Sequence, residues 1–114
     1  MAVIHYAGTV IRAYQVPDKR GVNPKDRPVL LVENFSDTDA EVYCVAITGA
    51  FDFPLPATSI LLPFSSSRNR CKTGLDKESV ADCTWTVVVA ACDIIERMGH
   101  IKATHLIEVR ANLQ

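Results

Sequence analysis

The sequence predicts one mainly β domain, a small curled sheet or barrel that is followed by a single C-terminal helix. Five or six short runs rich in β-branched and aromatic residues are separated by stretches rich in proline, glycine and charge. After Lys102 the apolar residues recur at helical spacing instead. A barrel is favoured over a flat sheet because a flat sheet would leave its edge strands open. The 114 residues suffice for one domain, which we expect to span residues 1–114.

The first half of the chain predicts three strands and one long loop. Residues 8–16, GTVIRAYQV, suit a half-buried strand that ends at Pro17. Residues 17–28 hold three prolines, one glycine and six charged side chains, so they predict an exposed loop, and loops of this length are often functional. Residues 29–35 and 41–48, VLLVENF and EVYCVAIT, predict an antiparallel hairpin because a turn-forming SDTDA segment joins them.

The second half predicts two more strands and the helix. After a proline-containing loop over residues 49–58, residues 59–64 form a short strand whose Pro63 indicates an edge or a bulge. Residues 65–78 predict a basic, serine-rich loop. Residues 79–95 form the longest apolar segment, and its valines and threonines favour a strand over a helix. The helix is indicated by apolar residues at helical spacing: Ala103, Leu106, Ile107 and Ala111.

Composition and charge narrow the class of protein. Hydrophobic residues make up 48% and charged residues 22% of the chain, which is typical of folded proteins. The net charge of −1 attracts no nucleic acid globally, but eight of the twelve basic residues fall in residues 19–27 and 68–77. No apolar run approaches the ~20 residues of a membrane span, and the first residues lack the pattern of a secretory signal. We therefore expect a cytoplasmic protein without a membrane partner.

Four cysteines occur without a C-x-x-C pair and without histidines at zinc-finger spacing: Cys44, Cys71, Cys83 and Cys92. Three lie in apolar, strand-like runs, where a free cysteine usually behaves as a small core residue. Cys71 is the exception, since it lies between Arg70 and Lys72, and neighbouring positive charge lowers a thiol pKa. We expect reduced, structural thiols, no metal site and no cofactor.

Four segments together resemble the MazF/PemK/Kid toxins of bacterial toxin–antitoxin systems. They are DRPVLLV, YCVAIT, KTGLDKESV and MGHI, in this order, and the resemblance covers about residues 8–112. It implies an SH3-like β-barrel of the CcdB/PemK type that forms a homodimer and is neutralised by an antitoxin. It also implies a ribosome-independent endoribonuclease that cuts single-stranded RNA at short sequences.

The resemblance also implies which residues act. The arginine of the Arg-Pro motif and the threonine that ends the next strand are the commonest active-site pair of this family, and here they are Arg27 and Thr48. The chain departs from the family in two places. GVNPKD stands where many members carry Gly-x-Glu-Gln, and Val80 stands where PemK/Kid-like members carry an arginine, although Asp82 matches their aspartate.

These residue types suit metal-free cleavage of RNA, in which the ribose 2′-OH attacks the adjacent phosphate. A guanidinium holds two phosphate oxygens and keeps its proton, so Arg27 suits the stabilisation of negative charge, and Thr48 adds a neutral hydrogen bond. Asp26 and Asp82 are both candidates for the base. Without the resemblance, Arg27 would be interpreted as half of a surface ion pair and Thr48 as an ordinary strand residue.

Two kinds of side chain are candidates for RNA binding. Basic residues suit phosphate contacts: Lys25, Arg68, Arg70 and Lys72. Phe51 and Phe53 suit stacking on unpaired bases, although such aromatics often cap a core or meet a second subunit. Trp85 is expected in the core, and His5, His100 and His105 in solvated or structural positions, with His100 in a turn.

Two other functions remain as alternatives. A non-catalytic barrel of the same fold that binds RNA or protein is consistent with the two departures from the family. A CcdB-like gyrase poison fits less well, because that activity resides in a C-terminal Trp-Gly-Ile and this chain ends ANLQ.

Overall fold

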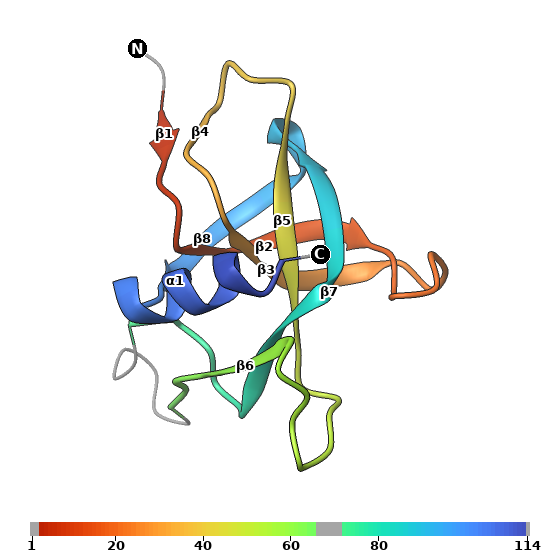
Figure 1. Ribbon diagram of the computed structural model, residues 1–114. Helices are drawn as coiled ribbons and strands as arrows, with labels where there is room; N and C mark the ends of the chain where they lie inside the picture. Colours follow the sequence, from red (N-terminus) through yellow and green to blue (C-terminus); the bar gives the residue numbers. More distant parts are fainter. Residues whose placement is uncertain (1–2, 66–71, 114) are drawn as a thin grey trace.

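The computed structural model of the protein describes residues 3–65 and 72–113 (Figure 1). Along the chain, the elements are β1 (Ile4–His5), β2 (Thr9–Val16), β3 (Lys25–Leu31), β4 (Phe35–Ser36), β5 (Glu41–Thr48), β6 (Ser59–Leu62), β7 (Ser79–Ala90), the 3-10 turn η1 (Ala91–Asp93), β8 (Ile94–His100) and α1 (Ala103–Ala111). The predicted mainly β fold with one C-terminal helix is therefore confirmed. No helix in the described ranges is long and apolar enough to cross a membrane.

The main sheet has six antiparallel strands in the order β6-β7-β5-β3-β2-β8, while β1 and β4 form a separate pair. Figure 1 shows that the large sheet curls, with β2 and β3 crossing behind the long β5 and β7. The predicted antiparallel pairing of β3 with β5 is confirmed, for example between Val29 and Ala46. β6 lies at the edge of the sheet, as Pro63 predicts.

The central strands bury both of their faces. Val10, Leu30 and Val45 belong to one apolar cluster, which α1 completes through Val109. Their neighbours along the same strands, among them Ile11, belong to a second cluster. Because successive residues of a strand point to opposite faces, two clusters on one sheet are the expected result of curling. This explains why β5 lacks a clear alternation of polar and apolar residues.

Residues 72–75 form backbone hydrogen bonds with both edges of the sheet, at β8 and just after β6. The backbone N–H of His100 in β8 donates to the carbonyl oxygen of Lys72 at 2.8 Å, and the N–H of Ser65, just after β6, donates to the carbonyl of Leu75 at 3.0 Å. Two glycines allow this approach. A Cβ on Gly99 would lie 2.0 Å from the carbonyl oxygen of Lys72, and one on Gly74 would lie 2.2 Å from that of Met98.

One predicted loop is wrong at its C-terminal end. The loop was expected over residues 17–28, but β3 begins at Lys25, so Arg27 lies in a strand, and β3 ends at Leu31 rather than at residue 35. Pro28 pairs with Arg12 of β2, whereas the first pair that β3 makes with β5 is at Val29. The first residues of β3 therefore have a partner on one side only, where proline is tolerated.

The predicted strand over residues 79–95 is two strands. β7 ends at Ala90, the chain turns through η1, and β8 continues to His100, which was wrongly expected in a turn. The turn contains neither glycine nor proline, so its sequence carries none of the usual turn signals. Cys92 lies in this turn and is exposed, which contradicts its expected place in the core. Cys44 and Cys83 are buried as predicted, and Cys71 lies outside the described residues.

Candidate active site

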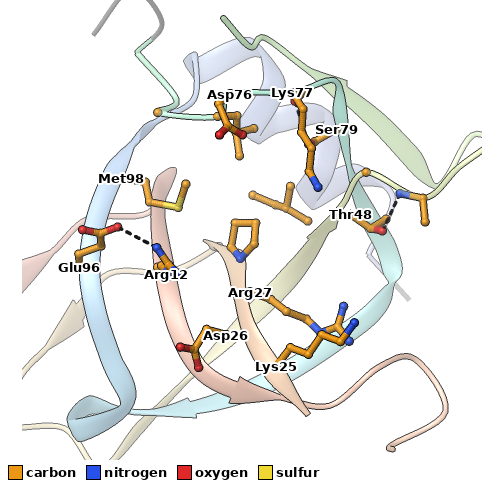
Figure 2. A pocket seen from close by; sticks show the side chains of 16 residues that line it. Arg12, Lys25, Asp26, Arg27, Thr48, Asp76, Lys77, Ser79, Glu96 and Met98 are labelled. Atoms are coloured by element: carbon orange, nitrogen blue, oxygen red, sulfur yellow. Dashed lines mark hydrogen bonds and ion pairs between the residues drawn. The ribbon is translucent and has the colours of Figure 1, made fainter. Parts of the chain in front are cut away.

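Two neighbouring hollows share a wall that contains Arg27, Thr48 and Ala50. The larger hollow measures about 690 Å³ and is drawn in Figure 2. The smaller one measures about 430 Å³ and is lined in addition by Asp18, Lys19, Arg20, Asp82 and Trp85. The fold thus brings the predicted pair together, since Arg27 lies on β3 and Thr48 at the end of the adjacent β5.

Arg27 is half-buried and held on two sides by backbone. Its Nε donates to the carbonyl oxygen of Val16 at 3.0 Å, and Nη2 donates to that of Asn23 at 3.2 Å. An arginine has five N–H donors, so these two bonds leave three for a ligand. The guanidinium carbon also lies 5.3 Å from the centre of the Trp85 ring, over its face. These contacts therefore orient the Arg27 side chain and leave three of its N–H donors for a ligand.

Thr48 is the last residue of β5, at the point where the chain leaves the sheet. Its Oγ1 accepts a hydrogen bond from the backbone N–H of Ala50 at 3.0 Å, drawn as a dashed line in Figure 2. Because the hydroxyl accepts this bond, its own hydrogen remains available as a donor. Figure 2 shows Arg27 and Thr48 on the same side of the larger hollow, with Asp26 and Lys25 at the base of β3.

The two candidate bases lie in different hollows. Asp26 lines the larger one, and its Oδ1 accepts hydrogen bonds from the backbone N–H of Gln15 at 3.1 Å and from Nε2 of the same residue at 3.3 Å. Asp82 lines the smaller one. Each therefore lines a hollow that Arg27 and Thr48 also line.

The Asp82 carboxylate accepts more hydrogen bonds than that of Asp26. Its Oδ1 accepts from the Thr84 hydroxyl at 2.6 Å and from the Thr84 N–H at 3.0 Å, and its Oδ2 pairs with the Lys19 ammonium at 3.1 Å. Burial raises the pKa of the Asp82 carboxyl, but the hydrogen bonds from Thr84 and Lys19 outweigh it, so this pKa lies below its ordinary value. A carboxylate of lowered pKa is a weaker base.

Lys19 lies in a loop whose backbone N–H groups bond to the side chain of Asp18. The Oδ1 of Asp18 accepts hydrogen bonds from the backbone N–H groups of Arg20 at 2.9 Å and Val22 at 3.0 Å. Lys19 and Arg20 line the smaller hollow and Lys77 the larger one, and none of the three was among the predicted site residues. Their membership of the two basic segments was the signal that could have identified them.

The predicted RNA-binding residues are distributed unevenly. Lys25 lines the larger hollow, whereas Lys72 is exposed and lines neither of the two. Phe51 and Phe53 contact each other edge to face, with ring centroids 5.6 Å apart, and they also line neither hollow. Arg68 and Arg70 lie outside the described residues. Within residues 3–65 and 72–113, no group of three or more potential ligands is placed to hold a metal ion.

Comparison with known proteins relates this fold to bacterial toxins. No protein-family model and no curated protein sequence matches the chain. Among solved structures, an endoribonuclease from a mycobacterial species superposes with a TM-score of 0.64 at 13% identity, covering 96% of this chain and 86% of the other. The Mycobacterium tuberculosis toxin MazF-mt6 gives 0.60 at 23% identity, covering 90% of each chain.

A MazE–MazF structure from Deinococcus radiodurans gives a TM-score of 0.63 at 16% identity, covering 97% of this chain and 92% of that one. These similarities extend over nearly the full length. The predicted fold, a MazF-like barrel with a C-terminal helix, is therefore confirmed.

Proposed function

From its MazF-like fold, we propose that this protein is the toxin of a toxin–antitoxin system and an endoribonuclease that cleaves single-stranded RNA without a metal ion. One observation carries the proposal: Arg27 and Thr48 lie on a wall shared by two hollows, and one candidate base lines each hollow, Asp26 the larger and Asp82 the smaller. A scissile phosphate at this wall has one neighbouring nucleotide in each hollow.

The chemistry assigns a separate task to each group. The ribose 2′-OH attacks the phosphorus, its proton passes to a carboxylate, and the bond to the 5′ oxygen breaks as that oxygen takes up a proton from solvent water, which leaves a 2′,3′-cyclic phosphate. Negative charge accumulates on the phosphate oxygens during this step. The three free N–H donors of Arg27 and the hydroxyl hydrogen of Thr48 stabilise that charge, and one such preorganised donor is worth ~2.7–4 kcal/mol.

Asp26 is the better candidate for the base. Only its Oδ1 accepts hydrogen bonds from the described residues, so its Oδ2 is available to accept a proton. Asp82 is bonded through both oxygens, and we assign it the task of holding the Lys19 ammonium in the smaller hollow. Lys19 then adds positive charge beside the phosphate.

The decisive experiment compares the wild type with Arg27→Ala and Arg27→Lys on single-stranded RNA in the presence of EDTA. Wild-type cleavage with mapped ends is expected, together with loss of cleavage in Arg27→Ala. Lysine should restore little activity because it lacks the planar pair of donors. Lys102→Ala, an exposed change that lines neither hollow, is the matched control. Wild-type rates in the Arg27→Ala protein would exclude this assignment.

The second candidate is a non-catalytic barrel that binds RNA or protein. It is favoured by Val80, which stands where the resemblance expects an arginine, and by the tight bonding of Asp82. Saturable binding of single-stranded RNA without any cleavage, by a folded wild-type protein, would support this alternative over the enzyme.

We further propose that the chain forms a homodimer and binds an antitoxin protein. The similarity to a MazE–MazF structure supports the proposal of an antitoxin partner. An antitoxin segment that folds into the hollows would cover the site. Co-expression with the product of a neighbouring short acidic reading frame should then abolish both growth arrest and RNA cleavage.

A further inference from the structure

Trp85 is buried, yet it belongs to neither apolar cluster of the barrel. It is 9% exposed and is one of the buried hydrophobic residues, which confirms its expected place in the core. However, the residues that pack into the two clusters do not include it, and its ring lines the smaller hollow instead. Packing within the two clusters therefore does not account for a tryptophan at this position.

The buried indole nitrogen gives a tryptophan at this position an energetic penalty. Nε1 of Trp85 is buried and has no hydrogen-bond partner among the described residues. A buried donor without a partner normally calls for an explanation, because a phenylalanine or a leucine would bury apolar surface without this penalty. Some other property of the indole ring must compensate for the unpaired N–H.

That property is the face that the ring presents to Arg27. The guanidinium carbon lies 5.3 Å from the ring centroid, within the ~6 Å of an effective cation–π contact, and tryptophan offers the most favourable ring for it. The two carbonyls of Val16 and Asn23 hold the guanidinium by Nε and Nη2. The guanidinium carbon lies over the face of the ring, so the ring and the two carbonyls together restrict the orientation of the group.

A register shift in β7 places the ring there. Val45 of β5 pairs with Thr86, but the next residue, Ala46, pairs with Asp82, so residues 83–85 have no partners in β5. Irregularities of this kind re-aim side chains next to functional sites. Trp85 is the last residue of this unpaired segment.

We propose that Trp85 is a positioning residue for Arg27 in the proposed RNA cleavage, with its indole face fixing the guanidinium toward the scissile phosphate. The inference rests on the proposed function. Trp85 itself does not touch the reacting atoms, so its effect passes through Arg27.

Trp85 is the only tryptophan of the chain, so intrinsic fluorescence tests the contact directly, without substrate. Arg27→Ala should shift the emission to longer wavelength, because water replaces the guanidinium on the ring face. Lys102→Ala should leave the emission unchanged. An unchanged spectrum in a folded Arg27→Ala protein would overturn the inference, whatever the protein does to RNA.

The kinetic test compares two replacements of the ring. Trp85→Phe keeps an aromatic face and should retain kcat within about threefold, whereas Trp85→Leu should lower kcat about tenfold with a smaller change in KM. Tyr43→Leu, an exposed aromatic on β5 that lines neither hollow, controls for the loss of a ring. Equal rates for Trp85→Leu and the wild type would overturn the positioning role while leaving the proposed function intact.

Two further outcomes are distinguished by design. If Trp85→Leu proves too unstable in thermal unfolding, the comparison of Trp85→Phe with the wild type and the fluorescence result decide the matter. If the wild type cleaves no RNA, the proposed function fails, and the variants are compared by their affinity for a 2′-O-methylated single-stranded RNA. A loss of affinity in Trp85→Leu that disappears in the Arg27→Ala background supports the positioning of Arg27, and an equal loss in both backgrounds contradicts it.

Discussion

Thr48 offers the simplest test at the scale of a single residue. Thr48→Val keeps the β-branched shape and removes only the hydroxyl. If that hydroxyl donates to a charged phosphate, its loss of ~1.5–3 kcal/mol should lower the cleavage rate by about one to two orders of magnitude. Single-turnover rates measure this effect. Thr48→Ser retains the hydroxyl and should keep most of the rate, and a valine variant as fast as the wild type would leave Thr48 with a structural role.

Asp82 predicts a dependence of stability on pH. Its pKa in the folded protein is lowered, so the carboxylate contributes stability above its ordinary pKa of ~3.9, and this contribution is lost as the pH falls through the lower folded value. Asp82→Asn should therefore reduce the melting temperature at pH 7, and the difference from the wild type should diminish as the pH falls below the ordinary carboxyl pKa and through the lower folded value. Melting curves over this range measure it.

The source of the lowered pKa can be checked separately. Lys19→Gln removes the ion pair with Asp82 but leaves both bonds from Thr84, so it should reproduce only part of the loss at pH 7. If Asp82→Asn and the wild type melt alike at neutral pH, the hydrogen bonds to this carboxylate contribute no net stability.

At the scale of an element, the hydrogen-bonded contact of residues 72–75 with β8 and with the end of β6 depends on two glycines. Gly99→Ala and Gly74→Ala would each place a Cβ 2.0–2.2 Å from a backbone carbonyl oxygen, so the backbone must move. We expect each change to lower the free energy of unfolding by more than ~2 kcal/mol, measured by urea denaturation.

Gly21 provides the matched control for this prediction. Its φ of +84° resembles the +73° of Gly74, but a Cβ there would meet nothing within 4 Å. Gly21→Ala therefore carries only the left-handed backbone penalty of ~1–2 kcal/mol. A loss at Gly74 no greater than that at Gly21 would show that the connection adapts without cost.

For the whole molecule, the buried thiols report on global unfolding. Burial, with a smaller contribution from the charge of Glu33, raises the pKa of the Cys44 thiol to about 12. Burial and the charge of Asp82 also raise the pKa of Cys83. Both thiols should resist alkylation at pH 8 in the native protein and react after denaturation, because the thiolate is the reactive form.

Peptide mass spectrometry distinguishes these positions from Cys92, which is exposed in η1 and should be labelled in the native state. Rapid native labelling of Cys44 would mean that the barrel opens locally at β5. Labelling of all three at the same rate would mean that the sheet is not a cooperative unit.

Much of the fold could be predicted from local pattern. β2 and β5 lie within one residue of their expected bounds, β6 lies within its expected range, and α1 begins just after Lys102 as predicted. These elements were predictable because β propensity, proline and helical spacing act over a few neighbouring residues. The start of β3 and the division between β7 and β8 could not be predicted from local pattern, because both depend on pairing with strands that are distant in sequence. A strand can begin among prolines and charges when its partner satisfies the backbone.

The candidate site, like the fold, could be predicted from the sequence only in part. The sequence by itself determined the residue types, and through its resemblance to a family it singled out Arg27 and Thr48. Only the tertiary structure decided that the two side chains share a wall between two hollows, that Lys19 pairs with Asp82, and that Trp85 lies under the guanidinium. The physical reason is that these neighbours come from separate strands and loops, and the curl of the sheet, together with the register shift in β7, sets their approach.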